Sequence, residues 1–134
     1  MPKKELTFLP ERLKQDSLGI KYSEDQNTFF DVTFHDSKIY ENTTIAYLSW
    51  IQGKGSGIRL LGYIIEKLLI KSQRDGHNIN LFIEPTTLDG STFIEKLRGL
   101  GIKLVHEDSE VNWNCRGYSI EVKPEVLKLL ASEA

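Results

Sequence analysis

The stretch "TTIAYLSWIQGKGSGIRLLGYIIEKLLIKSQRDG" (residues 43–76) decides the fold, because it contains a strand, a glycine turn and a helix in direct succession. Residues 43–50 are rich in β-branched and aromatic side chains and carry no charge, which predicts a central strand buried on both faces. From Ile58 onward apolar residues recur at steps of three and four, and Gly76 is well placed to end the resulting helix.

A second charge-poor segment, "INLFIEP" (residues 79–85), follows the helix and is typical of a strand that ends at Pro85. A strand–helix–strand crossover implies that it pairs in parallel with residues 43–50. The remaining expected elements are strands at 18–23, 27–36, 102–108 and 118–123, a long turn at 109–117, and helices at 10–15, 92–100 (capped by Ser91 or Thr92) and 124–131.

The outer strands are predicted to pair in an antiparallel manner, because polar turns join them. We therefore expect an α/β fold with a mixed, mostly antiparallel central sheet and helices on both faces. A length of 134 residues, with 40% apolar and 27% charged residues, fits one globular domain over residues 1–134. No internal repeat, low-complexity tract or interdomain linker divides it.

Charge and cysteine content exclude several classes of protein. The net charge of −2 and the pI near 5.9 argue against a nucleic acid as the main partner. Cys115 is the only cysteine, so no disulfide framework or cysteine-based zinc site can form within one chain. Charged residues interrupt the most apolar window, residues 58–70, and the N-terminal residues lack the apolar stretch of a signal peptide. We expect a cytoplasmic protein without a membrane segment.

The glycine turn between the central strand and the helix is the strongest functional signal. The first N–H groups of a helix lack partners within it, and glycines let backbone N–H groups crowd around an anion. Each hydrogen bond to a charged group contributes roughly 1.5–3 kcal/mol, so three or four would hold a phosphate ligand. The residues that would contribute are Gly53, Lys54, Gly55, Ser56, Gly57 and Ile58, with added attraction from Arg59. A tight connection without a ligand is the structural alternative.

Two common phosphate motifs do not match this turn. A Walker motif requires glycine, four residues and then Gly-Lys-Ser/Thr, and "GKGSG" lacks that triplet. A dinucleotide fingerprint requires G-x-G-x-x-G, whereas the glycines at 53–57 follow the pattern G-x-G-x-G. An ATPase, a GTPase and a Rossmann dinucleotide-binding protein are therefore excluded on motif grounds.

The hexapeptide Gln52-Gly53-Lys54-Gly55-Ser56-Gly57 matches Q/R-x-x-G-x-G/A, the acyl-CoA pyrophosphate motif of the GNAT (Gcn5-related) N-acetyltransferase family. The segment "FIEKLRGLGIKLV" (93–105) is similar to the helix and following turn that lie downstream of the motif in that family. The resemblance covers residues 44–122, which form the expected cofactor-binding core. Residues 1–43 match weakly, and the helix at 124–131 completes the chain.

This resemblance implies acetyl-CoA as the acyl donor, held where the central strand and its neighbour part. Backbone groups of Tyr47, Leu48 and Ser49 would bind the pantetheine arm. The segment 52–58 would bind the pyrophosphate, with Arg59 next to it. A homodimer is the oligomeric state that the family suggests.

The chain departs from the family at two catalytic positions. A tyrosine that protonates the departing thiolate is replaced by Ile94 or Leu97, depending on the alignment, and the central strand carries no glutamate. Glu84 is the candidate base, since it ends the strand beside the expected reaction centre, and Tyr118 is the candidate acid. Each also has a purely structural explanation, as a solvent-facing carboxylate and as an aromatic residue that packs on the sheet.

The sequence thus favours an acyl-CoA-dependent N-acyltransferase, acting by direct transfer of an acetyl group from acetyl-CoA to an unidentified amine. The alternative is a non-catalytic GNAT-like module that binds CoA or another anion. No metal is expected, because the three histidines lie on separate elements without ligand spacing and Cys115 has no evident partner. Trp113 fits either a hairpin plug or the wall of a substrate site.

Overall fold

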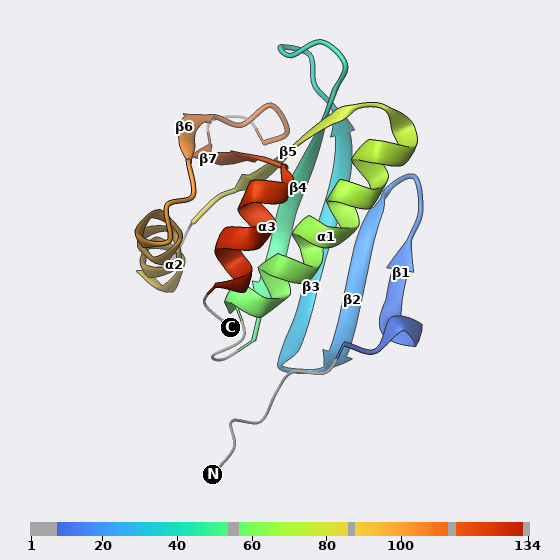
Figure 1. Ribbon diagram of the computed structural model, residues 1–134, viewed down its shortest axis with the longest axis vertical. Helices are drawn as coiled ribbons and strands as arrows, with labels where there is room; N and C mark the ends of the chain where they lie inside the picture. The colour runs from blue at the N-terminus through green and yellow to red at the C-terminus, as the bar shows by residue number, and fades with distance from the viewer. Residues whose placement is uncertain (1–7, 54–56, 86–87, 113–114, 133–134) are drawn as a thin grey trace.

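A seven-stranded mixed sheet with three α-helices forms the protein in the computed structural model, which describes residues 8–53, 57–85, 88–112 and 115–132 (Figure 1). The strands are β1 (Leu13–Gln15), β2 (Gly19–Asp25), β3 (Thr28–Asp36), β4 (Thr43–Gln52), β5 (Asn78–Ile83), β6 (Val105–Asp108) and β7 (Arg116–Glu121). The helices are the 3₁₀ turn η1 (Pro10–Arg12), α1 (Gly57–Asp75), α2 (Leu88–Gly99) and α3 (Pro124–Ala131).

The order of the strands in the sheet is β1-β2-β3-β4-β5-β7-β6. Among the strands of the described residues, only β4 and β5 are parallel neighbours, and all other neighbouring strands are antiparallel. This confirms the expected α/β class, the mixed and mostly antiparallel sheet, and the parallel crossover through α1. The central strand β4 is also the longest, with ten residues.

The expectation of helices on both faces is wrong for the described helices. Buried residues of α1, α2 and α3, including Leu61, Ile94, Leu97 and Leu130, belong to one core that covers a single face of the sheet. The crossovers β4–α1–β5 and β5–α2–β6 both lead towards the β6 edge of the sheet. Because such crossovers are right-handed, two that run in the same direction place their helices on the same face. We call it the helix face. The opposite face is called the loop face, because residues 37–42 and 109–112 lie beside it.

Strand ends differ by a few residues from the expectation, as in β7, which spans Arg116–Glu121 instead of 118–123. Three larger differences have physical reasons. Residues 10–15 form the 3₁₀ turn η1 followed by β1, not one helix. Helix α2 begins at Leu88, ahead of the expected caps, because burial of its apolar face outweighs the low helix propensity of Gly90. Strand β6 begins only at Val105, since Gly101 at φ 89° and the bond from the Ile102 N–H to the Leu97 carbonyl close the end of α2.

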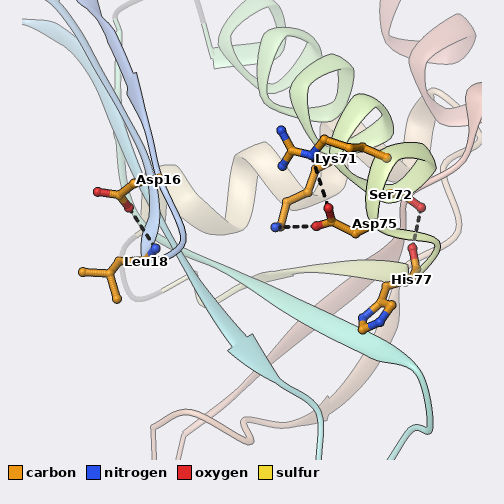
Figure 2. A network of polar contacts seen from close by, with 7 residues as sticks. Asp16, Leu18, Lys71, Ser72, Asp75 and His77 are labelled. Carbon is orange, nitrogen blue, oxygen red and sulfur yellow. Dashed lines mark hydrogen bonds and ion pairs between the residues drawn. The ribbon is translucent and has the colours of Figure 1, made fainter.

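The C-terminal end of α1 is closed by polar contacts (Figure 2). Lys71 Nζ lies 2.8 Å from Asp75 Oδ2, one turn later, and Ser72 Oγ donates a 2.6 Å hydrogen bond to the carbonyl of His77. Gly76 adopts a positive φ of 68°, and its N–H donates to the Ser72 carbonyl at 2.9 Å. These bonds confirm Gly76 as the helix stop and lead the chain directly into β5.

The close approach of β7 to β5 gives the first prediction. A Cβ added at Gly117 would contact the carbonyl oxygen of Ile83 and lie 2.9 Å from ring atoms of Phe82. Gly117→Ala is expected to lower the free energy of unfolding by about 1–3 kcal/mol, because the strand must shift to admit a methyl group. Chemical denaturation measures this. In the matched variant Gly62→Ala nothing lies within 4 Å of the new methyl group, and a gain of about 0.5–1 kcal/mol is expected.

Candidate functional site

The pairing between β4 and β5 stops before β4 ends. The last pair in register is Leu48 with Ile83, although β4 continues to Gln52. The remaining residues of β4 therefore run beyond the end of their parallel neighbour. We call this region, Ser49–Gln52 with Glu84 opposite, the β4–β5 fork. It lies at the carboxyl end of the only parallel pair, where crossover sheets bind their ligands.

A β-bulge in β4 lies at the same position. On the β3 side, Asp31 pairs with Trp50 and Val32 pairs with Leu48, so Ser49 is skipped. Ser49 thus has no register partner in either neighbouring strand. Bulges bend a strand and re-aim its side chains, and they recur next to active sites. Of the three residues expected to bind a pantetheine arm, Tyr47 and Leu48 are paired on both sides and Ser49 lies free of the ladders.

A tyrosine–glutamate pair lies beside the fork on the loop face. The Tyr47 hydroxyl donates a 2.7 Å hydrogen bond to Glu84 Oε2. Tyr47 is the register partner of Phe82, and its ring stacks on that side chain at 6.1 Å between centroids. Glu84 follows Phe82 by two residues and so points to the same face. The other oxygen, Glu84 Oε1, is buried without a hydrogen-bond partner in the described part of the chain.

Burial, together with the hydrogen bond and negative charge of Glu84, raises the pKa of Tyr47 to about 12, partly offset by Asn112. The phenol therefore stays protonated at neutral pH and keeps donating to the carboxylate. Asn112 and Cys115 belong to the turn that covers this face, and the Ser109 hydroxyl orders the turn by accepting from the N–H groups of Val111 and Asn112. The pair is thus half-buried, and Asn112 from the ordered segment 109–112 acts on it.

The hydrogen bond between Tyr47 and Glu84 predicts a specific pH dependence. The folded-state pKa of the phenol, about 12, exceeds the ordinary value of 10.0, so its contribution is complete below pH 10 and is lost as pH rises towards 12. The difference in free energy of unfolding between the wild type and Tyr47→Phe should shrink by about 1–2 kcal/mol over that interval, allowing for partial exposure. Urea denaturation at several pH values measures it. A difference that stays constant with pH would contradict the hydrogen bond.

A second carboxylate and an exposed aromatic ring flank the bulge on the β3 side. Asp31 Oδ1 is buried and has no hydrogen-bond partner among the residues that the structure describes. Its register partner Trp50 is 60% exposed, and the ring centroid of Phe29 lies 6.1 Å from that of Trp50. Carboxylates and aromatic faces both attract cations. The fork therefore has a surface suited to an ammonium group.

The structure separates the two expected catalytic residues. Tyr118 is the register partner of Ile83, whose side chain lies in the core of the helix face, whereas Glu84 points to the loop face. The Tyr118 ring stacks on His106 at 4.8 Å, and the Arg98 guanidinium lies 5.1 Å from its centroid. The phenol that contacts Glu84 is therefore that of Tyr47, which the sequence had suggested only for its backbone.

The described residues of the glycine motif stand at the end of β4 and at the start of α1. Gln52 is the last residue of β4 and is exposed, Gly53 follows it, and Gly57 is the first residue of α1. Ile58 is 8% exposed and packs into the core. Three expected phosphate-binding residues, Lys54, Gly55 and Ser56, lie outside the described residues, as does Trp113.

Gly57, the last residue of the motif, and Arg59, two residues later, also have packing environments that do not depend on a ligand. A Cβ added at Gly57 would lie 3.2 Å from Phe93 Cε2, so close packing of α2 against the start of α1 also favours glycine there. Arg59 lies on a hollow of about 170 Å³ between α1 and α3, together with Phe8 and Tyr63. Their expected roles in phosphate binding stay predictions.

Sequence patterns missed the bulge and the Tyr47–Glu84 pair. Both depend on register, and the only available signal was that Tyr47 and Glu84 share a face once Tyr47 pairs with Phe82. His35, on β3, bonds Thr33 Oγ1 through Nε2 at 2.9 Å. In the described ranges no three His, Cys, Asp or Glu side chains gather to hold a metal ion, and no helix there is long and apolar enough to cross a bilayer.

Comparisons with protein-family models, curated proteins and solved structures found no match for this chain. Its function must therefore be argued from the residues and the geometry of the β4–β5 fork.

Proposed function

We propose that this protein is an acyl-CoA-dependent N-acyltransferase that moves an acetyl group from acetyl-CoA to an amine. The observation that carries the proposal is the coincidence of three features at one place. The only parallel pair of the sheet ends at Leu48 and Ile83, β4 is bulged at Ser49, and the glycine turn that opens α1 follows directly. Backbone groups of Ser49, which has no register partner, and the N-terminus of α1 would then face one ligand from two sides.

The cofactor half of the proposal rests on the segment from Ser49 to Gly57. Unpaired backbone groups around Ser49 suit the amide groups of a pantetheine arm, because they offer strand-like hydrogen bonds. The N-terminus of the 19-residue helix α1 suits the pyrophosphate. The six-residue motif that begins at Gln52 supplies the remaining support.

The chemistry proposed for the fork uses Glu84 as the base. The ammonium group of the acceptor gives a proton to Glu84, and the neutral nitrogen attacks the thioester carbonyl. The C–N bond forms and the C–S bond breaks. The proton that the attacking nitrogen loses as it becomes the amide passes to the departing thiolate, so CoA leaves as its thiol, and Glu84 afterwards returns its own proton to water. Backbone N–H groups at the bulge would polarise the carbonyl, and Tyr47 would hold the Glu84 carboxylate in position.

The charge around the fork supports an amine as the acceptor. Glu84 and Asp31 each have a buried oxygen without a partner in the described structure, and Trp50, the register partner of Asp31, exposes its ring. An ammonium group would supply the hydrogen bond that the Glu84 carboxylate lacks, and the Asp31 carboxylate would add attraction. An anionic acceptor would meet repulsion at the same place.

Turnover of acetyl-CoA with a panel of primary amines, followed by release of free thiol, tests the proposal. We expect release above the rate of spontaneous hydrolysis for at least one amine. Binding of acetyl-CoA without release with any amine would instead identify a CoA-binding module. Absence of both binding and release would reject the proposal.

A further inference from the structure

A polar cavity of about 280 Å³ lies on the loop face at the opposite end of β5 from the fork. Four adjacent strands supply its floor, since residues of β4, β5, β7 and β6 that share this face line up in register. The lining residues are Tyr40, Thr43, Asn78, Asn80, Val105, Glu107, Ser119 and Glu121. At about 30 Å³ per molecule it has room for roughly nine waters, the size of a small metabolite.

Hydrogen-bonding groups on the floor of the cavity lack protein partners. Ser119 is only 6% exposed, and neither its hydroxyl nor the carboxamides of Asn78 and Asn80 make a side-chain hydrogen bond within the described residues. Asparagine is depleted in strands, yet two stand on β5, a central strand. Asn78 is exposed and Asn80 is half-buried, so Ser119 is the buried member of this set. Buried polar groups are normally satisfied, and a ligand in the cavity would supply the bond that the Ser119 hydroxyl lacks.

Hydrogen bonds between residues 37–40 and residues 107–110 hold the outer wall of the cavity in position on the loop face. Glu110 accepts from Ser37 Oγ at 2.8 Å and from the N–H of Lys38 at 2.7 Å. The Tyr40 hydroxyl donates to Glu107 Oε2 at 3.1 Å. These bonds join the loop after β3 to β6 and to the turn after it, more than sixty residues later, so protein contacts alone hold the wall in place.

The cavity carries a negative charge. Glu107 and Glu121 both line it, and none of its lining residues is basic. Lys123 neutralises part of this charge, with Nζ 3.3 Å from Glu121 Oε1. At the rim, Tyr40 and Val105 are 43% and 45% exposed and offer apolar surface to a carbon skeleton.

We propose that this cavity binds a small hydroxylated primary amine. The ammonium group would donate to the Glu107 and Glu121 carboxylates, and the hydroxyl groups would bond Ser119 and the two asparagines. The Tyr40 ring would cover the carbon skeleton. The site is distinct from the fork, because Glu84, the residue after β5, lies four residues beyond Asn80, about 13 Å at 3.3 Å per residue. It therefore does not depend on the proposed acyl transfer.

Titration of the ¹⁵N-labelled protein with glucosamine, observed through its amide resonances, tests the site. Glucosamine should cause saturable shifts at residues 78–80, 105–107 and 119–121, and glucose, which lacks the charge, should bind at least about tenfold more weakly. The double variant Glu107→Gln and Glu121→Gln should weaken glucosamine by about tenfold or more and leave glucose unchanged, because glutamine keeps the shape and removes the charge.

A matched control and a second variant make the result decisive. Glu125→Gln removes an exposed carboxylate from α3, on the other face, and should leave glucosamine binding unchanged. Ser119→Ala should weaken glucose and glucosamine alike, by about three- to tenfold. Equal binding of the two sugars, shifts that persist in the double variant, or shifts outside the cavity would overturn the proposal.

Discussion

Glu84→Gln is expected to lower the turnover of acetyl-CoA with an amine acceptor by about 100-fold or more, because glutamine cannot take the proton of the acceptor. The affinity for acetyl-CoA should stay within about twofold, since in the proposal Glu84 contacts the acceptor and not the cofactor. Glutamine can still accept the 2.7 Å hydrogen bond from Tyr47, so the local structure should be kept. Thiol release measures the turnover, and calorimetry measures the affinity.

Two further variants distinguish a specific loss of the proposed base from a general effect of the substitution. Tyr47→Phe should reduce turnover by about tenfold, because it frees the Glu84 carboxylate without removing it. Glu125→Gln, on the distant helix α3, should leave turnover unchanged. If Glu84→Gln kept turnover within threefold of the wild type, Glu84 would not be the base, and positioning alone would have to explain the reaction.

Gly55→Glu is expected to raise the dissociation constant of acetyl-CoA by at least about 100-fold. Three or four hydrogen bonds of roughly 1.5–3 kcal/mol each are proposed to hold the pyrophosphate, and a carboxylate in the motif would both block and repel that group. Gly99→Glu places the same carboxylate at the end of α2, where nothing lies within 4 Å of the new Cβ. That control should keep the wild-type affinity. Equal affinity of both variants would reject the motif assignment.

The elements that depend on local pattern were predictable from the sequence. The uncharged strand β4, the apolar period of α1 and the stop at Gly76 each follow from residues close together in the chain. The parallel pairing of β4 with β5 also follows, because a helix between two strands allows little else. Glu84 directly follows β5 and lies beside the point where the pairing of the two strands ends, and its role as a base stays a prediction.

Features that depend on register or on packing between distant segments were not predictable. The side of the sheet on which α2 lies depends on where β6 is inserted, and β6 pairs with β7 beyond β5. The choice of Tyr47 over Tyr118 as the partner of Glu84 depends on which residues share a face. The bulge at Ser49 shifts by one residue which side chains of β4 point to each face. No sequence pattern marks the position of this bulge.

The polar cavity shows the same limit. Asn78 and Asn80 stand out in the sequence because asparagine is uncommon in strands. That they line a cavity together with Glu107 and Glu121 depends on the pairing of other strands beside β5. The tether between Ser37 and Glu110 joins residues 73 positions apart. No periodic pattern reports such a contact.

An amide-resonance titration of the wild-type protein with acetyl-CoA tests the central claim most directly. We predict saturable shifts that are largest at Ser49, Gln52, Gly53 and Gly57, at the point where β4 passes its parallel neighbour and α1 begins. Shifts confined to other surfaces, or none at millimolar acetyl-CoA, would contradict the account.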